Sequence, residues 1–567
     1  MKTLISKEKD IVGIWGIQDG SGNPQPGWTE YFPTHDHSFC IIDSNGNVKN
    51  SIELERLTRV KHDHRLSKYI ESFNKYLPED FIVVSVNHLA GTSFISENAL
   101  WRIENNPFEI SDLITPTKVY VNRKEREGYI CSHELAHIGS MLPFVGEFKE
   151  NSLLIHIDGL ASDSCFSVFQ FKNGEIKYLH HGWEPLLVTQ LFGFNDLTCA
   201  MLGLDENHRL ATPGRLMGYS SYGKYSKKIR EWLNKNNWYK EYWKNPNTIF
   251  PDIKKEFGKD IKGFDLKEHF FMDIARVCQQ EFEDIVIPLI EKYQKETGSE
   301  YLYFSGGCAL NINLNTKLFD SKKFKEVYVP PCCSDTGLAL GAASIIQMLR
   351  GGKMEVHSPF ICNIGVEKKK IPKLSKNTIE EIVDRLSKKE VMGVCIGYSE
   401  SGPRALGHRS ILAIPTSKDM YDKVNTEIKK REWYRPLAPI ITEDLAEEVF
   451  PNSTETDLSK YMLSNFNISK KWIDKIPAVV HIDKTARAQV IGEKNKELEP
   501  IYAILKRMWD KYEIPCLINT SFNGPGEPIV HTDEDAIRSA TKLGLDFVLI
   551  DNKIVDIKAN GKKQGII

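Results

Sequence analysis

Short apolar strands alternate with amphipathic helices along most of the chain. In the first half, the hydrophobic pattern predicts a long helix over residues 268–297 and strands over residues 81–86, 153–157, 165–171, 301–304 and 326–329. Several of these strands run directly into turns that carry Gly or Asp, among them Asp158-Gly159 and Gly306-Gly307. In α/β proteins, ligands gather at the carboxyl ends of strands, so we expect the chemistry of the chain at these turns.

A break in the pattern separates two long segments. Residues 351–376 are rich in Gly, Pro and Lys, as linkers often are. A helix is expected to restart at Thr378, where Glu381 completes a capping box, and a strand follows over residues 391–397. We therefore predict an α/β chain with a first domain over residues 1–355, a linker over 356–376 and a second domain over 377–567.

The composition and the charge of the chain argue against several classes of protein. With 567 residues, of which 41% are hydrophobic, the chain can bury more than one core. Its formal net charge of −2 offers no basic surplus for nucleic acid. No apolar run approaches the ~20 residues of a membrane helix, no secretion signal is found, and the 11 cysteines include no CxxC pair. We therefore expect a cytoplasmic protein with reduced thiols, without a nucleic-acid or membrane partner.

A pair of histidines one helical turn apart is the strongest local signal. His133 and His137 lie at i and i+4 on one helix face, where both imidazoles can reach one metal ion. With Glu134 they also match H-E-x-x-H, the zinc-protease signature, although the extended metzincin form fails and a third ligand farther on stays open. Asp158 and Asp335, each at the end of an expected strand, form an alternative ligand set with the two histidines. Two imidazoles and one or two carboxylates suit Fe(II), Mn(II) or Zn(II).

Three Gly-rich turns in the first domain favour nucleotide or phosphate binding over a purely structural role. Gly306 and Gly307 lie between a strand and an expected helix, where backbone N–H groups can point at an anion. The turn over residues 334–337 repeats this plan, and the turn over residues 212–218 adds cationic side chains. None of the three is a Walker A loop or a Rossmann GxGxxG, so they name no reaction.

The second domain gathers cations together with neutral hydrogen-bonding side chains. Guanidinium groups bind phosphate oxygens in a bidentate way, and Ser, Thr and Asn can orient a carbonyl or an amide. Many of the cations lie beside Pro, Gly or aromatic residues rather than on an amphipathic helix face, which favours a pocket for one or two phosphates over a solvated surface. The candidates are Arg404, Lys429, Arg431, Arg435, His481, Thr485, Arg487, Asn519, Ser521 and Asn523.

Several long motifs resemble those of a known family. They are His35-Asp36-His37-Ser38 and the stretches over residues 55–63, 402–410, 431–439 and 519–530. The chain resembles, over nearly its whole length, the O-carbamoyltransferases of antibiotic and nodulation-factor biosynthesis, of the NodU/CmcH type. The resemblance implies an actin/Hsp70-type (ASKHA) first domain with two duplicated α/β lobes, similar to the tRNA threonylcarbamoyl transferase. It implies a YrdC-like α/β second domain, similar to threonylcarbamoyl-AMP synthase.

The resemblance also implies a reaction in two steps. The second domain would make carbamoyl-adenylate and pyrophosphate from carbamoyl phosphate and ATP, with Mg²⁺. The first domain would transfer the carbamoyl group to a hydroxyl of a small-molecule acceptor, a secondary metabolite or a sugar, at a metal that is typically iron, Fe(II) or another divalent ion. By the family pattern the metal ligands are His133, His137, Asp158 and Asp335. Oligomers larger than a homodimer are not expected.

Roles for further residues follow from the same resemblance. His35 is the expected general base for the acceptor hydroxyl, and Lys61 the group that stabilises developing negative charge. The expected adenylate contacts in the first domain are Gly306, Gly307, Asn311, Arg215 and Gly218. In the second domain, phosphates would bind Lys429, Arg431, Arg435, Arg487 and Ser521, while Arg404, His481 and Asn519 would place the carbamoyl end.

The sequence departs from the family pattern at a few positions. Glu134 replaces a second histidine, His408 an asparagine and Arg215 a lysine. Residues 17–32 extend the family's usual start and would form either a lid over the acceptor or a surface loop. Other functions remain open at this point: a tRNA-modifying threonylcarbamoyl enzyme, an H-E-x-x-H zinc metalloprotease and a nucleotide-binding regulator.

Overall fold

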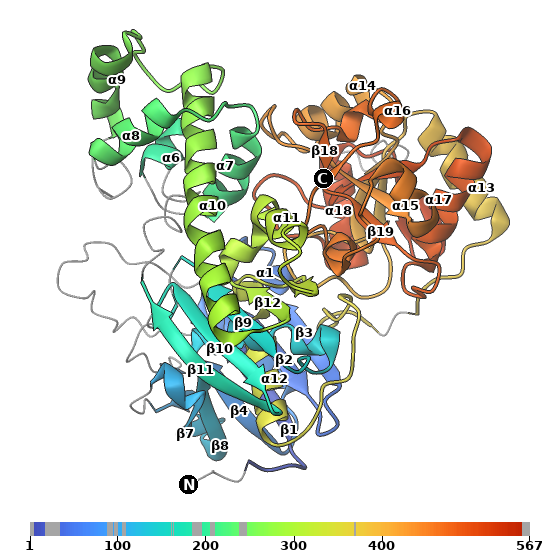
Figure 1. Ribbon diagram of the computed structural model, residues 1–567. Coiled ribbons are helices and arrows are strands. Elements are labelled where there is room, and N and C mark those ends of the chain that lie inside the picture. The colour runs from blue at the N-terminus through green and yellow to red at the C-terminus, as the bar shows by residue number, and fades with distance from the viewer. Residues whose placement is uncertain are drawn as a thin grey trace.

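The computed structural model describes residues 5–16, 35–87, 94–95, 100–104, 109–159, 161–162, 164–183, 196–204, 210–236, 246–367 and 370–557. Residues 17–32, which would form a lid or a surface loop, lie outside the described residues, as do residues 368 and 369 of the expected linker. The described chain forms three large sheets and one small two-stranded sheet (Figure 1).

The first large sheet has three adjacent parallel strands at its centre, β1, β4 and β8. Its order is β3-β2-β1-β4-β8, followed by β7, β6 and β5. Strands β1, β2 and β3 pair antiparallel, whereas β1–β4 and β4–β8 are parallel. The strand bounds are β1 (Asp10–Trp15), β2 (Ser38–Ile42), β3 (Val48–Glu53), β4 (Phe81–Val86), β5 (Phe94–Ile95), β6 (Trp101–Ile103), β7 (Ile114–Val121) and β8 (Lys124–Cys131).

The second sheet repeats the five-strand plan of the first. Its order is β11-β10-β9-β12-β13, again with three antiparallel strands followed by two parallel ones. The repeat confirms the expected two-lobed, actin/Hsp70-type arrangement. Strands β4 and β9 are buried along their whole length, which explains why both are almost continuously apolar. The strand bounds are β9 (Ser152–Ile157), β10 (Phe166–Lys172), β11 (Glu175–Gly182), β12 (Tyr301–Ser305) and β13 (Glu326–Tyr328).

Two helices pack closely against each other between the lobes. They are α3 (His133–Gly139) and α12 (Leu338–Leu349). A Cβ on Gly341 would collide with the carbonyl of Ala136, and a Cβ on Gly139 with the carbonyl of Gly341. Only glycine therefore allows the two backbones to approach this closely. Because α12 also packs on β1 and β2, the position of α3 is tied to the first sheet.

A helical layer covers the second lobe. The long helix α10 (His269–Thr297) confirms the predicted helix and ends at Gly298, which adopts a positive φ. Figure 1 shows α6, α7, α8 and α9 gathered around one end of α10, with α7 on the side of the C-terminal domain. None of the described helices is long and apolar enough to cross a membrane. The bounds are α6 (Asp196–Met201), α7 (Thr212–Ser220), α8 (Lys227–Lys235), α9 (Ile249–Phe257) and α11 (Ile312–Asp320).

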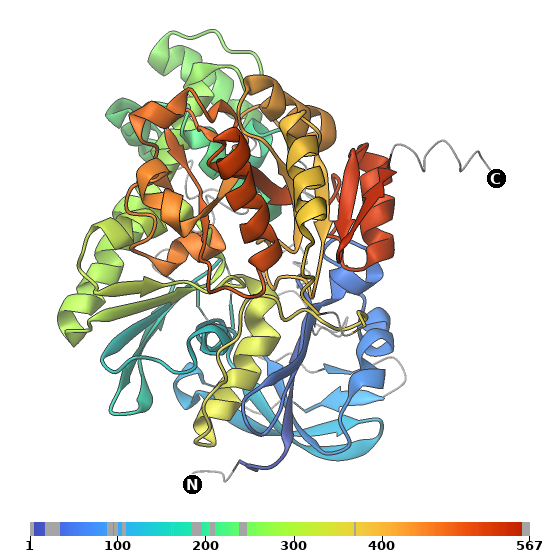
Figure 2. The same cartoon turned by 90° about the vertical axis from the view of Figure 1, so that its right-hand side faces the viewer.

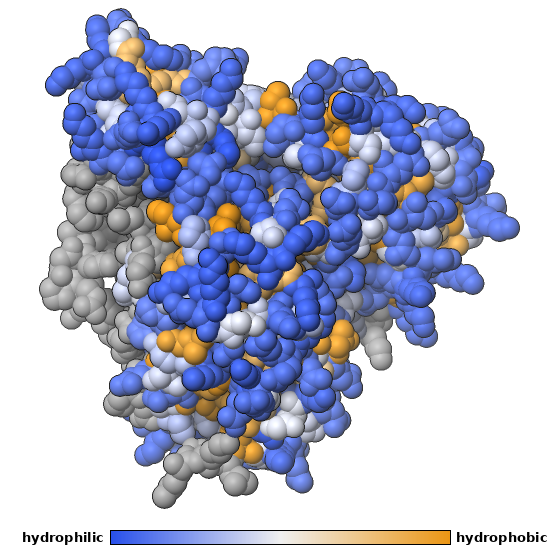
Figure 3. All heavy atoms as spheres, viewed as in Figure 1, coloured by the Kyte–Doolittle hydropathy of each residue, from blue (hydrophilic) through white to orange (hydrophobic). Residues whose placement is uncertain are grey.

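The C-terminal domain is a mixed α/β unit. Figures 1 and 2 show it above the two N-terminal sheets, and in Figure 1 it lies beside the helical layer around α10; Figure 3 shows that the face in view is mostly hydrophilic. Its sheet has the order β19-β16-β20-β15-β14-β21-β22. The strands are β14 (Met392–Cys395), β15 (Arg409–Ala413), β16 (Ala438–Thr442), β19 (Gln489–Ile491), β20 (Cys516–Ser521), β21 (Phe547–Ile550) and β22 (Lys553–Asp556). The main helices are α13 (Lys376–Ser387), α15 (Glu443–Val449), α17 (Glu499–Tyr512) and α18 (Asp533–Leu543).

The join between the two halves differs in detail from the prediction. Helix α13 begins before Thr378, because the Ser375 hydroxyl caps it by accepting the N–H of Thr378. Within the expected linker, Phe360 stacks on His408 with ring centroids 3.5 Å apart. Cys362 pairs with Ser51 of the first lobe and with Ser399 of the C-terminal domain. The described part of this segment is therefore packed against both halves.

Candidate functional site

Four predicted ligands meet where α3 faces the ends of two chain segments. His133 and His137 are fully buried on α3, whose first turn is capped by the Ser132 hydroxyl. Asp158 follows β9 directly, and Asp335 opens the short helix η6 (Asp335–Gly337). Asp335 was predicted at a strand end, but β13 already ends at Tyr328, so the cluster combines one strand end, one short helix and the face of α3.

The geometry of this cluster suits a divalent cation. The Nε2 atoms of His133 and His137 lie 3.0 Å apart, and each lies 3.4 Å from Oδ1 of Asp335. His137 Nε2 is also 3.3 Å from Oδ2 of Asp158, and one ligand atom from each of the four residues lies within 4.8 Å of the others. Two imidazole nitrogens and two carboxylates that point at one another form a donor set for a first-row transition metal. The residues therefore fit the iron that the resemblance implies.

The charges within the cluster shift its pKa values. Burial lowers the pKa of His137, but hydrogen bonds to Asp158 and Asp335 outweigh it and raise the value to about 9. Burial raises the pKa of Asp335, but the neighbouring imidazoles hold it well below its usual range. The carboxylates are thus ionised and ready to bind a cation.

The Gly-Gly turn holds one of the ligands. The N–H of Gly307 donates to Oδ2 of Asp158 at 2.6 Å, and the N–H of Gly159 donates to Oδ1 at 2.5 Å. Gly306 has a φ of +100°, and a Cβ there would collide with the carbonyl of Ile157. The turn predicted to hold a phosphate therefore orients the Asp158 carboxylate.

Asn311 also serves the protein's own framework. Its side-chain oxygen caps α11 by accepting the N–H of Leu314 at 3.1 Å, and its amide group donates to Gln279 at 3.2 Å. A contact between Asn311 and a nucleotide stays a prediction.

Two further buried groups border the cluster. The Ser164 hydroxyl donates to Oε1 of Glu134 at 3.1 Å, and Glu134 does not belong to the set of four ligands. His156 stacks on His137 with ring centroids 5.0 Å apart. Burial, followed by the charge of His137, holds the pKa of His156 well below its usual range, so this imidazole is neutral. His156 was not among the residues predicted from the sequence, although residues two apart in a strand point to the same side and His156 lies two residues before Asp158.

A polar chain leads away from the cluster. Nε2 of His35 lies 3.8 Å from Oδ2 of Asp335, and its Nδ1 lies 3.2 Å from Asp36. The same Asp36 carboxylate binds Nδ1 of His62 at 3.0 Å. Lys61 Nζ contacts both carboxylate oxygens of Glu55, at 2.7 and 2.8 Å. His35 is thus beside the cluster, whereas Lys61 is held by Glu55.

Burial lowers the pKa of His35, but Asp335, Asp36 and Asp158 together raise it to about 9. The imidazole is therefore protonated at neutral pH as long as no cation neutralises the charge of Asp335.

A second site lies between the two domains. A cavity of about 220 Å³ opens there, with Gly218 of α7 and Ile312 of α11 on the N-terminal side. Most of the cations and polar residues predicted in the C-terminal domain line its other side: Arg404, Arg431, Arg435, His481, Thr485, Arg487, Asn519 and Ser521.

Four guanidiniums and one carboxylate, that of Asp483, are among the described residues that line the cavity. Among the described residues, no acceptor or carboxylate pairs with the guanidinium of Arg404 or Arg487. Burial and then the neighbouring guanidiniums lower the pKa of Arg487 well below its usual range, and burial followed by Arg435 lowers that of Arg431 to about 9. Oδ1 of Asn519 also has no partner among the described residues. This arrangement favours an anion with several oxygens.

The remaining predicted residues support the walls of the cavity. Lys429 is buried, and its Nζ donates to the Ser521 carbonyl at 2.6 Å and to Oδ1 of Asn523 at 2.8 Å. Lys429 and Asn523 thus position the loop that carries Ser521. Arg215 of α7 binds Oε1 of Glu432 at 2.9 Å, so it faces the C-terminal domain.

Two family models match the chain. Carbamoyltransferase N-terminus matches residues 88–344, and Carbamoyltransferase C-terminus matches residues 383–556. The chain belongs to the carbamoyltransferase family. Both halves of this enzyme are therefore shared with other carbamoyltransferases.

Individual relatives also span both halves of the carbamoyltransferase. The nodulation protein NolNO of Sinorhizobium fredii is 27% identical over 92% of this chain and 79% of its own. An uncharacterized protein of Methanocaldococcus jannaschii is 28% identical over 92% of this chain and 98% of its own. Among solved structures, full-length HypF in the phosphate- and nucleotide-bound form aligns with 63% of this chain and 58% of its own, at 15% identity and a TM-score of 0.32.

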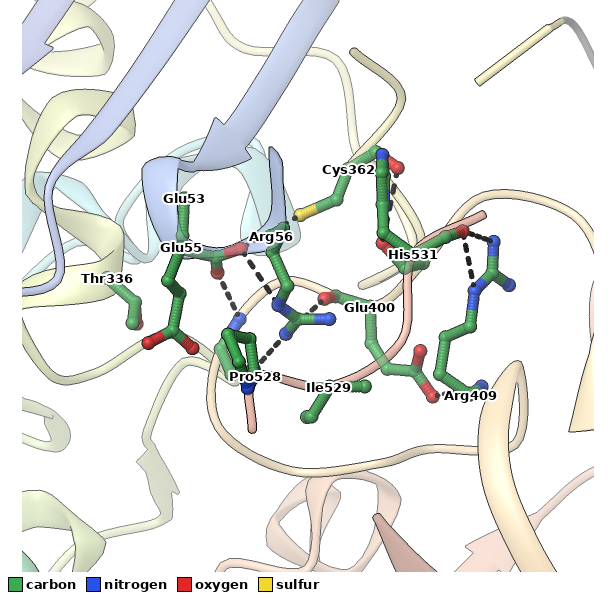
Figure 4. A network of polar contacts seen from close by, with 12 residues as sticks. Glu53, Glu55, Arg56, Thr336, Cys362, Glu400, Arg409, Pro528, Ile529 and His531 are labelled. Atoms are coloured by element: carbon green, nitrogen blue, oxygen red, sulfur yellow. Dashed lines mark hydrogen bonds and ion pairs between the residues drawn. The ribbon is translucent and has the colours of Figure 1, made fainter. Parts of the chain in front are cut away.

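A buried network joins the two domains of the carbamoyltransferase (Figure 4). Arg56 of α1 (Leu54–Thr58) lies 3.5 Å from Glu53 and donates to the carbonyls of Glu400 and Gly402, at 3.4 and 3.0 Å. Glu53 in turn accepts the N–H of Gly402 at 3.0 Å. Glu53 and Arg56 therefore hold the loop that leads to Arg404.

Proposed function

We propose that this carbamoyltransferase forms carbamoyl-adenylate from ATP and carbamoyl phosphate in its C-terminal domain and transfers the carbamoyl group to a hydroxyl in its N-terminal domain. The proposed domains are residues 1–355 and 377–567, joined by residues 356–376. The observation that carries this proposal is the arginine-rich cavity between the domains, in which Arg404 and Arg487 have no ion-pair partner among the described residues. A polyphosphate bound there would be within reach of the N-terminal side.

The activation step needs an oxygen nucleophile and a leaving group. Water releases phosphate from carbamoyl phosphate, and an oxygen of the resulting carbamate attacks the α-phosphorus of ATP, so pyrophosphate leaves. Arg404, Arg431 and Arg487 stabilise the negative charge on the phosphates, in a cavity where Mg²⁺ accompanies ATP. Asn519 offers a buried oxygen that can accept from the carbamoyl amino group.

The transfer step uses the cluster of the N-terminal domain. Fe(II) or another divalent ion held by His133, His137, Asp158 and Asp335 would supply Lewis-acid polarisation of the carbamoyl carbonyl. His35 takes the proton of the acceptor hydroxyl, whose oxygen attacks the carbamoyl carbon while AMP leaves. This role requires neutral His35. A cation bound by Asp335 would neutralise the charge that raises the pKa of His35 most, so the pKa of His35 would fall and the imidazole could be neutral. We assign Lys61, held by Glu55, to charge stabilisation near the acceptor.

The acceptor and the setting of the reaction belong to the same proposal. The acceptor is a hydroxyl of a small molecule, a secondary metabolite or a sugar, as in antibiotic biosynthesis. The enzyme works in the cytoplasm as a monomer or homodimer, without nucleic acid or membrane.

Pyrophosphate release without acceptor tests the activation step. The full chain, loaded with Fe(II), is incubated with ATP, Mg²⁺ and carbamoyl phosphate, and pyrophosphate and carbamoyl-adenylate are followed by mass spectrometry. We expect both products, and neither when carbamoyl phosphate is omitted. If the loaded enzyme makes no adenylate, the activation step is wrong, and proteolysis and plain nucleotide binding are tested next.

A further inference from the structure

Aromatic rings pack next to His481, which lines the arginine-rich cavity. The rings of Tyr222 and Trp433 meet edge to face with centroids 4.8 Å apart, and Tyr222 meets His481 in the same way at 5.6 Å. His481 lines the cavity, as does Ser221, the neighbour of Tyr222. Trp433 is 37% exposed, unusually so for an indole in a folded protein. Part of the indole is therefore free to contact a ligand.

The chain holds these rings in a fixed position beside the cations. The Tyr421 hydroxyl donates to the carbonyls of Trp433 and Arg435, at 2.5 and 2.9 Å. Trp433 lies between Arg431 and Arg435 in the sequence, and both arginines line the cavity. One pinned loop therefore presents an aromatic surface and phosphate-binding groups side by side. Ile482, which is 56% exposed, adds an apolar side chain next to His481.

We propose that Trp433, Tyr222 and His481 form the nucleobase subsite of this cavity, which binds the purine ring of ATP while the arginines bind its phosphates. The proposal rests on the proposed ATP-dependent activation. A nucleoside polyphosphate joins a flat ring to a chain of negative charges, and here aromatic rings in contact with His481 adjoin a cavity lined by four arginines. Stacking on aromatic side chains suits a base because every base has a π-face.

The subsite is built by both domains. Trp433 and His481 belong to the C-terminal domain, whereas Tyr222 directly follows α7 of the N-terminal domain. The N-terminal domain therefore contributes to nucleotide binding at the activation site, although it carries the transfer site. Stacking depends on ring area, so we expect ATP to bind more tightly than CTP.

Binding of ATP and of inorganic tripolyphosphate separates the base from the phosphates. Dissociation constants of both probes, with Mg²⁺, are measured calorimetrically on the full chain and on Trp433→Ala and Tyr222→Ala. We expect each variant to weaken ATP binding about tenfold and to leave tripolyphosphate binding unchanged. Trp433→Phe should retain most of the affinity for ATP, which separates loss of stacking from loss of folding.

Two control variants anchor the experiment. Trp183→Ala removes another exposed indole, which is 40% exposed after the end of β11, and should change neither dissociation constant. Arg487→Ala should weaken both probes, because it removes a phosphate contact. Unchanged ATP affinity in Trp433→Ala would overturn the proposal. Equal weakening of ATP and tripolyphosphate binding in Trp433→Ala would also overturn it, because Trp433 would then only position the arginines that bind the phosphates. If the wild-type chain binds neither probe, the proposed activation step itself fails.

Discussion

The cluster around His137 and the cavity around Arg487 attract ligands of opposite charge: the cluster suits a cation, and the cavity suits an anion. In the cluster, ionised carboxylates and imidazoles surround a point where a cation fits. In the cavity, burial holds the pKa of Arg487 well below its usual range, and the neighbouring guanidiniums lower it further. Each site is thus electrostatically incomplete in the opposite sense. This difference suits an enzyme that binds a metal in one place and a polyphosphate in another.

The two sites also differ in how they are held. The cluster rests on regular elements, a helix pinned by the contact between Gly139 and Gly341 and a residue at the end of a buried strand. The cavity rests on loops that buried charges fix in place: Glu400 accepts the backbone N–H groups of Leu406, His408 and Arg409. Loops fixed in this way can present several cations to one ligand without rearrangement.

Removal of a ligand from the cluster should have the largest effect. We expect His137→Ala to abolish carbamoyl transfer while pyrophosphate release continues in the cavity. Its metal affinity should fall at least about a hundredfold, because loss of an outer partner alone already costs about 10- to 100-fold. Metal content is measured by inorganic mass spectrometry, and AMP release is followed with a panel of sugar acceptors.

Glu134→Gln is the matched control for this variant. Glu134 lies on the same helix but is bound by Ser164 and is not among the four ligands, so metal content and transfer should be retained. In an H-E-x-x-H protease this glutamate is the general base. Loss of metal in Glu134→Gln would contradict the ligand assignment, whereas loss of transfer with retained metal would give Glu134 a part in the transfer step.

Removal of a cation from the cavity should have the next largest effect. Arg487 has no partner among the described residues, so Arg487→Ala breaks no internal contact of the guanidinium. We expect pyrophosphate release to fall about 10²- to 10³-fold, as when one donor is removed from a charge-stabilising site. Arg487→Lys should recover only part of the loss, because an ammonium lacks the planar fork. Metal content should stay unchanged in both variants. Loss of metal together with pyrophosphate release would contradict the separation of the two sites.

The connection between the sites can be broken at Arg56. This side chain is buried, pairs with Glu53 and holds the loop that leads to Arg404. We expect Arg56→Ala to lower the free energy of unfolding by about 3 kcal/mol, because Glu53 is left buried without its partner. Urea unfolding followed by circular dichroism measures the change. Lys68→Ala, which breaks an exposed pair with Glu71, should cost less than about 1 kcal/mol.

The sequence predicted the cluster better than the cavity, because local rules govern the cluster. Histidines at i and i+4 must share a helix face, and an aspartate that follows a buried strand, as Asp158 does, must lie at a sheet edge. The Gly306-Gly307 turn was predicted to hold an anion, and the anion that it holds in the structure is the Asp158 carboxylate. That the same turn also contacts the adenylate stays a prediction.

Packing between distant segments could not be predicted in the same way. Nothing in the sequence near Tyr222 points to Trp433, and nothing near Arg215 points to Glu432, because these pairs form only when the two domains meet. At the start of α13, Ser375 caps the helix although Thr378 and Glu381 also match a capping pattern. Competing caps within one turn differ by too little energy for a pattern to separate them.

The smallest effect concerns the stability of the cavity as a function of pH. In the folded chain the pKa of Arg431 is lowered to about 9 by burial and then by Arg435, so its charged form is less stable in the folded state than in the unfolded state. The resulting cost is fully present below about pH 9 and decreases as Arg431 loses its proton above that pH. Tripolyphosphate neutralises the same charges, so it should raise the melting temperature most near neutral pH and less as the pH rises through about 9. Thermal melts of the ligand-free and ligand-saturated chain over this range measure the difference. If the gain in melting temperature does not vary with pH, the pKa of Arg431 is not lowered in the folded chain.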